Sequence, residues 1–216
     1  VHIGNFREVI TSAQIAKALR SKGKKVRFIY SWDDFDAFRK VPKDFPKDFK
    51  KYLGMPLCKT PDPKGCHKSY AEHFEKEMEQ SIEQLDLGIE YIYQGEMYQS
   101  CKYAEHIKEV LNKKEKIAEI LNKYRKEPLA KEWLPIEVFC ESCWKNTTNI
   151  LDYNGEYEIH YECKCNHSNK FDFRKVGNVA LLWRADWPMR WNYEKVDFEP
   201  AGKDHYAAGG SRTTGK

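Results

Sequence analysis

The sequence predicts an α/β fold that is interrupted by a small cysteine-rich subdomain. Residues 9–19 carry apolar side chains at helical spacing, and the apolar stretch 26–31 follows, an order typical of half a mononucleotide-binding unit. Four cysteines then flank a predicted hairpin between residues 140 and 165, and a second apolar strand is expected at 179–183. These observations predict a Rossmann-like nucleotide-binding core with an inserted zinc-ribbon subdomain.

Composition narrows the class of protein. The chain has 216 residues, 41% hydrophobic and 32% charged, which is typical of a globular protein with one large or two small domains. No apolar run is long enough for a membrane span, and no signal peptide is expected. The net charge of +4 permits contact with RNA without requiring it. Seven cysteines, an odd number, favour metal binding over disulfides and therefore a reducing compartment, the cytoplasm.

The first predicted helix begins at a candidate phosphate site. Apolar residues at 9, 10, 13, 15, 16 and 19 fit an amphipathic helix, with Asn5 as its N-cap and Glu8 completing a capping box. Gly4 would let a ligand approach the backbone closely. His2 and Asn5 could donate hydrogen bonds to a phosphate drawn to the positive end of the helix dipole. The alternative is an ordinary helix cap beside a surface histidine.

Acidic side chains follow the first predicted strand. After a polar break with a C-cap glycine at Gly23, the strand 26–31 leads to Asp34 and Asp36. The carboxyl end of such a parallel strand faces the ligand crevice, where carboxylates can hold an ammonium group or a ribose hydroxyl. A solvated acidic loop is the alternative.

The loop-like stretch 42–63, which contains five prolines, leads to a candidate metal group. Four side chains of types that zinc accepts as ligands lie there: Asp62, Cys66, His67 and His73. Cys58 is a possible substitute ligand. Because an adjacent cysteine and histidine rarely ligate one ion comfortably, a capped helix start with unrelated histidines is the alternative.

The middle of the chain is predominantly helical. Residues 69–87 predict an exposed amphipathic helix, 89–93 a strand, and 97–124 one or two helices. The basic clusters at 113–116 and 123–126 predict a solvated helix face, with contact to RNA as the alternative. Cys101 is expected to be buried.

Two short cysteine pairs beyond a linker at 128–135 predict the zinc ribbon. They are Cys140 with Cys143, and Cys163 with Cys165, and Asn154-Gly155 between them predicts a tight hairpin. Four thiolates would close the coordination sphere of zinc, so the role is structural rather than catalytic. The second pair is one residue closer than usual, and His167 could replace one sulfur.

Tryptophans and charged residues follow the expected strand 179–183. Three indoles beside arginine and aspartate fit a wall that binds a cation with an aliphatic stem, or else core aromatics with a buried Arg–Asp pair: Trp183, Arg184, Asp186, Trp187, Arg190 and Trp191. A further strand at 196–200 is expected to open a helix at 202–205. The small residues 207–211 should pack tightly or bend that helix.

Several of these stretches resemble one known family. His2-Ile3-Gly4-Asn5 followed by Phe6-Arg7-Glu8 resembles the His-Ile-Gly-His-type signature of class I aminoacyl-tRNA synthetases, and the variant with asparagine looks like class I lysyl-tRNA synthetase. Three further stretches agree with that subgroup: 30–36 (Tyr-Ser-Trp-Asp-Asp-Phe-Asp), 182–191 (Leu-Trp-Arg-Ala-Asp-Trp-Pro-Met-Arg-Trp) and 198–205 (Phe-Glu-Pro-Ala-Gly-Lys-Asp-His).

The resemblance implies ATP-dependent activation of L-lysine, with Mg²⁺ accompanying ATP, and transfer to the lysine tRNA. It implies catalytic groups at the phosphates, His2 and Asn5, and further ATP contacts from Gly4, Asp204 and His205. Candidates for the lysine or adenine pocket are Trp183, Asp186, Trp187 and His205. Asp34 and Asp36 are candidates for substrate or ribose. The resemblance also favours Zn²⁺ at the Asp62 group in addition to the ribbon.

The expected organisation is a first catalytic part over 1–127, the ribbon over 128–175, and a second catalytic part over 176–216. The chain begins inside a motif and lacks the family's Lys-Met-Ser-Lys-Ser-type loop, so we expect a monomeric internal fragment that is a poor catalyst alone. The alternatives are a non-enzymatic zinc-containing RNA-binding module, a synthetase paralogue, or a nucleotidyltransferase of the same superfamily.

Overall fold

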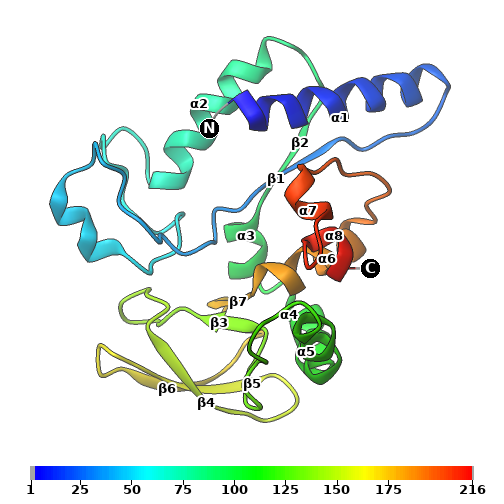
Figure 1. Ribbon diagram of the computed structural model, residues 1–216. Helices are drawn as coiled ribbons and strands as arrows, with labels where there is room; N and C mark the ends of the chain where they lie inside the picture. The colour runs from blue at the N-terminus through cyan, green and yellow to red at the C-terminus, as the bar shows by residue number, and fades with distance from the viewer. Residues whose placement is uncertain (1–2, 216) are drawn as a thin grey trace. The chain divides into compact units, whose positions relative to one another are not determined.

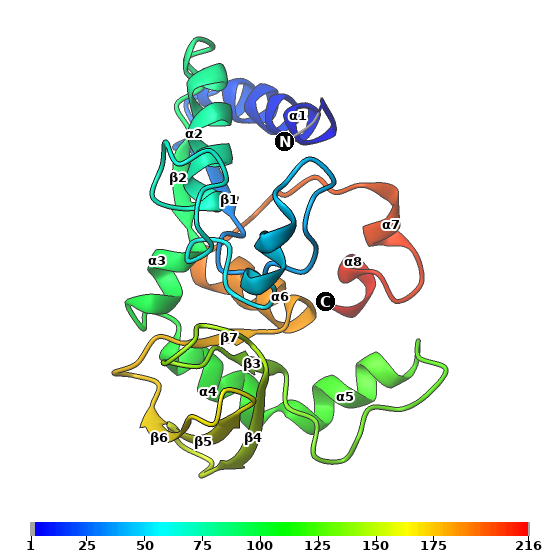
Figure 2. The ribbon, with the colours of Figure 1, turned by 90° about the vertical axis from the view of Figure 1, so that its left-hand side faces the viewer.

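The described part of the chain forms two compact units. The computed structural model describes residues 3–215. One unit contains the chain up to Met97 together with Phe139–Thr147, and the other contains Tyr98–Val138 and the chain from Thr148 onward. The strands form sheets of two and three strands, and Figures 1 and 2 show them together with helices, which confirms the α/β class.

The first unit contains a parallel pair of strands, β1 (Ile29–Trp32) and β2 (Glu90–Tyr93). The 3-10 helix η1 (Lys47–Tyr52) and the helix α2 (Tyr70–Glu83) lie between them in the chain. Parallel strands cannot be joined by a tight turn, so this long helical connection is what their pairing requires. The predicted order of helix and then strand at the start of the chain is confirmed.

Helix α1 (Ile3–Ser21) buries one face in the first unit. Its buried positions share a core cluster with residues of α2 and of the segment before β1: Val9, Ala13, Ala16, Phe28, Met78 and Ile82. Spacings of three and four residues place the α1 members on one face of the helix. The predicted C-cap is confirmed, because Gly23 has φ of +74° and its N–H donates to the carbonyl oxygen of Arg20 at 2.9 Å.

The predicted N-cap of α1 is wrong. The helix already includes Ile3, so Asn5 lies inside its first turn with helical geometry. An N-cap residue must have a non-helical backbone, which Asn5 does not.

Helix α2 begins at the N-cap Ser69, and two side-chain hydrogen bonds resemble a capping box. The hydroxyl of Ser69 accepts a hydrogen bond from the N–H of Glu72 at 3.1 Å, and the carboxylate of Glu72 accepts one from the N–H of Lys68 at 2.7 Å. The predicted helix is therefore present. The capped helix start, which was the alternative considered for the segment around His67 and His73, is present as well. The short helix α3 (Gln94–Gln99) follows β2 directly.

The second unit contains two antiparallel sheets. β3 (Ile136–Val138) pairs with β7 (Val179–Leu181). β4 (Thr148–Tyr153), β5 (Glu158–Cys163) and β6 (Ser168–Asp172) form a three-stranded sheet in chain order.

The predicted hairpin at Asn154-Gly155 is confirmed. Gly155 has φ of +80°, a conformation that favours glycine. The side-chain oxygen of Asn154 accepts hydrogen bonds from the N–H groups of Glu156 and Glu158 at 2.9 and 3.1 Å. An asparagine that bonds to its own turn stabilises the reversal locally.

Two helices account for the predicted helical stretch 97–124 in the second unit, α4 (Ala104–Asn112) and α5 (Lys114–Asn122). Cys101 was expected to be buried but is only half-buried. It lies in the turn before α4 with φ of +58°, so its backbone is in the left-handed region.

The last segment differs from the sequence-based prediction. Strand β7 stops at Leu181, and three helices follow: α6 (Trp183–Glu194), α7 (Lys203–Tyr206) and α8 (Ser211–Thr214). The predicted strand 196–200 is wrong, because Val196 and Phe198 are 37% and 53% exposed and no strand pairs with them among the described residues. The break between α7 and α8 at the small residues is confirmed. Across residues 3–215, no helix combines the length and apolar character needed to cross a membrane.

Candidate functional site

The predicted phosphate site lies only partly within the described residues. His2 is outside them. Gly4 and Asn5 lie in the first turn of α1 and are half-buried. The positive end of a helix dipole favours anions at the first turn. The beginning of α1 therefore suits a phosphate even though Asn5 is not its cap.

Asp34 and Asp36 follow β1, and their environments differ. Asp34 is 7% exposed, and its Oδ1 accepts a hydrogen bond from the N–H of Gly95, the second residue of α3, at 2.7 Å. Burial raises the pKa of Asp34 to about 6, and the N–H of Gly95 opposes part of that rise. Asp36 is exposed and lies 3.7 Å from Arg39. The solvated acidic loop thus describes Asp36, whereas Asp34 is a buried carboxylate at the start of a helix.

A second buried carboxylate, Glu75 on α2, interacts with Asp34. Glu75 is 6% exposed, and within residues 3–215 its Oε1 has no hydrogen-bond partner. Burial, and then the charge of Asp34, raise the pKa of Glu75 to about 8. Burial followed by the same charge raises the pKa of Cys58 to about 12. Cys58 therefore belongs to this buried acidic region, and the prediction that it could substitute as a metal ligand is not supported.

The structure brings together the four side chains of the predicted metal group in the first unit. One ligand atom from each of these residues lies within 4.8 Å of the others: Asp62, Cys66, His67 and His73. The sulfur of Cys66 is 3.2 Å from Nδ1 of His67 and 3.3 Å from Nδ1 of His73. A carboxylate, a thiol and two imidazoles suit zinc.

Asp62 is positioned by the backbone of its own turn. The N–H of Lys64 donates to Oδ1 at 3.0 Å, and the N–H groups of Cys66 and His67 donate to Oδ2 at 2.8 Å each. Although burial acts in the opposite direction, these hydrogen bonds hold the pKa of Asp62 below its ordinary value. The turn therefore presents an ionised carboxylate and accommodates the adjacent cysteine and histidine.

The four ribbon cysteines occupy two tight turns. In the first, the N–H of Trp144 donates to the carbonyl oxygen of Cys140 at 2.7 Å. In the second, between β5 and β6, the N–H of Cys163 donates to the carbonyl oxygen of His167 at 2.8 Å. Their sulfurs form a group within 4.8 Å that could hold a metal ion: Cys140, Cys143, Cys163 and Cys165. His167 is not part of this group, so four thiolates and not three are the available ligands.

A tryptophan ladder runs along α6 in the second unit and consists of Trp183, Trp187 and Trp191. Consecutive rings are four residues apart, with centroids separated by 6.1 and 6.0 Å. Residues at that spacing share one face of a helix. Trp183 at the helix start is 42% exposed, whereas the other two are half-buried.

His205 on α7 faces the ladder. Its ring meets Trp187 edge to face at 4.8 Å and 89°, and lies 6.4 Å from Trp183. Nδ1 of His205 is 2.8 Å from the hydroxyl of the buried Ser211. The structure therefore brings together three predicted pocket residues as one aromatic wall with an imidazole on it.

Asp186 does not lie on that wall. It is 7% exposed, its Oδ1 accepts a hydrogen bond from the hydroxyl of Tyr98 at 2.5 Å, and its Oδ2 is 2.7 Å from Arg190. The buried Arg–Asp pair, which the sequence offered as part of the alternative to a binding wall, is therefore present. Trp183 is nevertheless exposed, so the tryptophans are not simply core aromatics. A substrate contact for Asp186 stays a prediction.

Asp204 is exposed on α7. The chain that follows α7 passes so close to it that position 210 has no room for a Cβ. A Cβ on Gly210 would lie 2.4 Å from the carbonyl oxygen of His205 and 2.7 Å from that of Asp204. The tight packing expected of the small residues after α7 is confirmed, and it fixes the backbone that carries both candidate ATP contacts.

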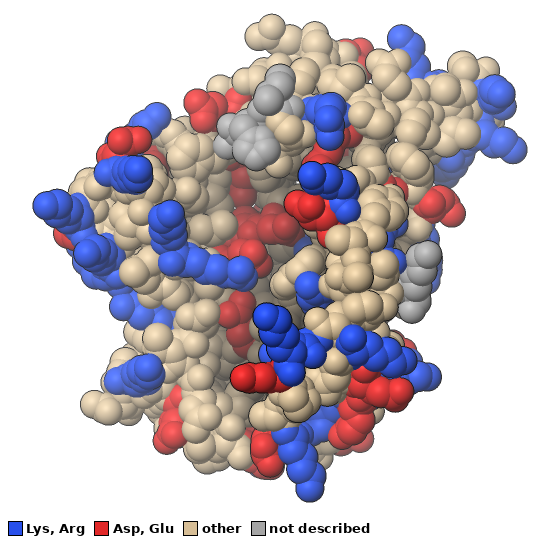
Figure 3. Space-filling view, viewed as in Figure 1, with Lys and Arg blue, Asp and Glu red and all other residues tan. Residues whose placement is uncertain are grey.

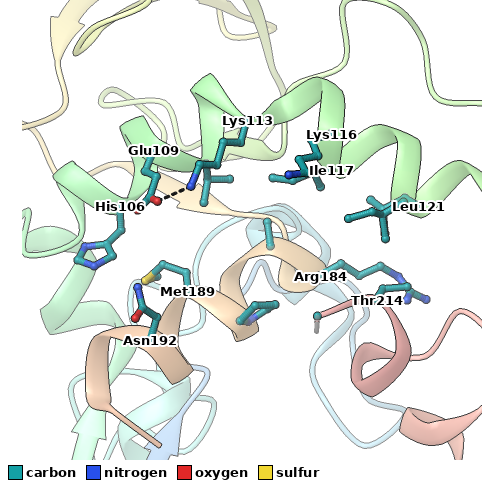
Figure 4. Close-up of a pocket in the computed structure, with 15 residues that line it drawn as sticks. His106, Glu109, Lys113, Lys116, Ile117, Leu121, Arg184, Met189, Asn192 and Thr214 are labelled. Carbon is teal, nitrogen blue, oxygen red and sulfur yellow. Dashed lines mark hydrogen bonds and ion pairs between the residues drawn. The ribbon is translucent and has the colours of Figure 1, made fainter.

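A groove in the second unit is lined mainly by residues outside the predicted site. Its lining comes from α4, α5 and α6 and includes Ile117 and Met189, and Glu109 pairs with Lys113 at its rim at 2.6 Å (Figure 4). Of the residues of the predicted wall, Arg184 lines it, whereas the three tryptophans do not. The groove therefore does not coincide with the predicted site.

Surface charge is mixed. On the face drawn in Figure 3, lysine and arginine side chains are interspersed with aspartate and glutamate. In the predicted basic clusters, Lys113 pairs with Glu109, and Lys123 lies 3.9 Å from Glu119. These pairs favour a solvated helix face over an RNA contact.

Two residues near the aromatic wall were missed from the sequence. Ser211 contacts His205, and Glu199 accepts hydrogen bonds from two indoles of the ladder. Glu199 lies within the stretch that carried the resemblance, but no spacing rule connects an acid to tryptophans eight and twelve residues before it. Only the fold of the irregular segment before α7 places it there.

A family model and individual relatives both relate this chain to tRNA synthetases. A model of the family described as "tRNA synthetases class I (K)" matches residues 1–216. Over its whole length the chain is 47% identical to the lysine–tRNA ligases of Pyrococcus horikoshii and Borreliella burgdorferi, and 43% identical to that of Methanocaldococcus jannaschii. The chain spans 42%, 42% and 41% of the length of those three relatives.

Proposed function

We propose that this chain, which belongs to the family of class I tRNA synthetases of the lysine type, provides the catalytic core of an enzyme. That enzyme would join L-lysine to the lysine tRNA and consume ATP. The observation that carries the proposal is the match of the family model to residues 1–216, together with 47% identity to a lysine–tRNA ligase along the whole chain.

The proposed chemistry has two steps. An oxygen of the lysine carboxylate attacks the α-phosphorus of ATP, pyrophosphate leaves, and lysyl-adenylate forms. A ribose hydroxyl at the end of the tRNA then attacks the lysyl carbonyl carbon, and AMP leaves. Neither step needs a nucleophile from the protein, so the residues act by positioning and by stabilising charge. Mg²⁺ bound with ATP would neutralise phosphate charge.

A Rossmann-like core would carry this chemistry. The parallel pairing of β1 and β2 across a helical connection supports such a core, because nucleotide-binding sheets are built from parallel strands joined in this way. We propose the boundaries 1–127 and 176–216 for the two catalytic parts, and 128–175 for the inserted ribbon.

His2, Gly4 and Asn5 are proposed to meet the ATP phosphates. The first turn of α1 supports this assignment, since the positive end of the helix dipole favours anions there. Removing a donor that acts mainly as charge develops commonly lowers the rate on the order of 10²-fold. His2→Ala in the full-length protein should therefore depress turnover and leave the lysine KM nearly unchanged. A strongly raised lysine KM with turnover intact would contradict the assignment.

The aromatic wall is proposed to bind lysine or adenine. Trp183, Trp187 and His205 offer ring faces to an aliphatic stem or a base, and their mutual contacts support one pocket. Asp204 would contact ATP from α7. Asp34 and Asp36 are kept as candidates for substrate or ribose, although Asp34 is already engaged with the start of α3.

Two zinc ions are proposed. The four cysteines would hold a structural ion, and Asp62, Cys66, His67 and His73 a second. Protein purified without chelator should contain about two zinc equivalents. Cys140→Ser and His73→Ala should each remove one, and Cys140→Ser should also unfold β4–β6, because a structural metal contributes folding energy. A content of one that His73→Ala leaves unchanged would exclude the second site.

Lysine-dependent ATP–pyrophosphate exchange by the full-length protein tests the proposed function. Exchange that requires lysine, and that arginine or ornithine does not replace, is the expected result. Binding of RNA with no exchange under any amino acid would instead favour a non-enzymatic RNA-binding module. Sedimentation should find a monomer, which is a separate prediction, as is a cytoplasmic location.

A further inference from the structure

Glu199 accepts hydrogen bonds from two indoles of the tryptophan ladder. Nε1 of Trp187 donates to Oε1 at 2.9 Å, and Nε1 of Trp191 donates to Oε2. The two rings are neighbours on one face of α6, with centroids 6.0 Å apart. One carboxylate in the irregular segment before α7 thus sets the orientation of two consecutive rings.

Arg212 on α8 holds the same residue from a third direction. Its guanidinium lies 3.7 Å from Oε2 of Glu199, donates to the carbonyl oxygen of Glu199, and sits over the ring of Trp191 at 4.7 Å. The side chains of Glu199 and Arg212 are 31% and 22% exposed. Hydrogen bonds to a charged acceptor are roughly twice as strong as neutral ones, so the carboxylate is firmly placed.

The ring that Glu199 orients is the one that meets His205. The edge-to-face contact between Trp187 and His205, at 4.8 Å and 89°, requires the indole to keep its present rotation. His205 has a support of its own in Ser211, at 2.8 Å. The two rings are therefore fixed from separate sides, the indole by a carboxylate and the imidazole by a hydroxyl.

We propose that Glu199 is a positioning residue of the amino acid site, which holds the Trp187 ring in the orientation that forms a binding wall with His205. This inference rests on the proposed function, because it takes Trp187 and His205 to contact lysine. Glu199 touches the indoles and Arg212, and it acts on the substrate only through them.

The test is Glu199→Gln in the full-length protein. A glutamine keeps the size of the side chain, but its amide group cannot accept the second indole N–H. Asp197→Asn is the matched control, since it removes one carboxylate charge from an exposed residue two positions away. Lysine KM, ATP KM and kcat are measured by ATP–pyrophosphate exchange, and tryptophan emission is recorded without substrates.

The expected result for Glu199→Gln is a rise of about tenfold in lysine KM, the size expected for one lost hydrogen bond to a charged group. The kcat and the ATP KM should stay within about twofold of the wild type, and the emission maximum should shift. The control should change none of these. A lysine KM equal to that of the wild type, or a loss of kcat alone, would overturn the proposal.

Trp187→Phe provides a second variant if Glu199→Gln fails to fold. It removes the N–H donor to Glu199 and retains a ring, so lysine KM should rise with kcat nearly unchanged, and an unchanged lysine KM would overturn the proposal. Where Glu199→Gln folds, adding it to Trp187→Phe should raise lysine KM less than the two separate effects predict. Fully additive effects would overturn the proposal. A wild-type protein without lysine-dependent exchange would refute the proposed function itself, whereas an active wild type with an unaffected Glu199→Gln refutes only the role of Glu199.

Discussion

Four carboxylates, two in each unit, are held in different ways. In the first unit, Asp34 and Asp62 accept hydrogen bonds from backbone N–H groups of a helix start and a turn. In the second unit, Asp186 and Glu199 are held by the side chains of arginines, tyrosine and tryptophans. Backbone-held carboxylates depend on the path of the chain, whereas side-chain-held ones depend on particular partners. Substitutions should therefore have different consequences in the two units.

The largest effect is expected where a buried carboxylate has a charged partner. Asp186→Ala removes an ion-pair partner of Arg190, whose side chain is 14% exposed, and also removes an acceptor of the Tyr98 hydroxyl. Breaking a buried ion pair from one side costs about 3–5 kcal/mol, because the remaining charge stays buried. Urea unfolding followed by circular dichroism should show a loss of that size.

The exposed Asp152 provides the control for this prediction. Asp152→Ala should change the free energy of unfolding by less than about 0.5 kcal/mol. If Asp186→Ala cost no more than that, the view that side-chain partners anchor the carboxylates of the second unit would be wrong.

The next effect is a pH dependence that arises from the buried Asp34. Burial raises its pKa from 3.8 to about 6 in the folded protein. A raised folded pKa contributes stability that is fully present below pH 3.8 and is lost as the pH rises through about 6. A shift of about two units corresponds to about 3 kcal/mol. Between pH 4 and pH 7, the wild type should lose roughly that much stability relative to Asp34→Asn.

Unfolding by urea at pH 4, 5, 6 and 7 measures this difference, which is independent of any constant cost of the substitution. Glu75 acts in the same direction, since the charge of Asp34 contributes to its raised pKa and that contribution disappears in Asp34→Asn. A difference between wild type and variant that is flat over this range would show that Asp34 is not a strained carboxylate. It would also weaken the contrast with Asp186.

The smaller effect of Gly95→Ala tests how closely the backbone of α3 approaches Asp34. An added Cβ would lie 2.6 Å from Oδ2 of Asp34 and 2.9 Å from the sulfur of Cys58, so both side chains must move. Overpacking of this kind typically costs about 1–3 kcal/mol. At Gly202 the nearest atom would be 4.0 Å away, and Gly202→Ala should cost under about 1 kcal/mol. Equal costs at the two glycines would remove the argument for close backbone approach.

The sequence predicted those features whose interacting residues are close in the sequence, and it missed features whose partners are distant. The turn at Asn154-Gly155 and the C-cap at Gly23 were predicted because their interactions lie within a few residues, and the Asp62 group because its members share the short stretch 62–73. The strand expected at 196–200 was wrong because alternating apolar residues there face solvent, and its glutamate serves distant indoles instead. Local spacing did suggest the pair of Asp186 with Arg190, four residues apart, but the contacts of Glu199 require the tertiary fold.

The smallest expected effect concerns Ser69, which holds a backbone N–H at the start of α2. Its hydroxyl accepts from the N–H of Glu72 at 3.1 Å, and the residue is 6% exposed. Ser69→Ala should cost about 1 kcal/mol in urea unfolding, the usual value of a lost N-cap. Ser69→Asp keeps an acceptor and should recover most of that stability. Ser81→Ala, at an exposed position inside the same helix, should be neutral within about 0.5 kcal/mol.

Zinc content should also be measured in Ser69→Ala, because His73 lies in the first turn of α2. Unchanged zinc would show that the turn of Asp62 holds the metal group without help from the Ser69 cap. A loss of zinc would show that this backbone-held group also depends on the side chain of Ser69.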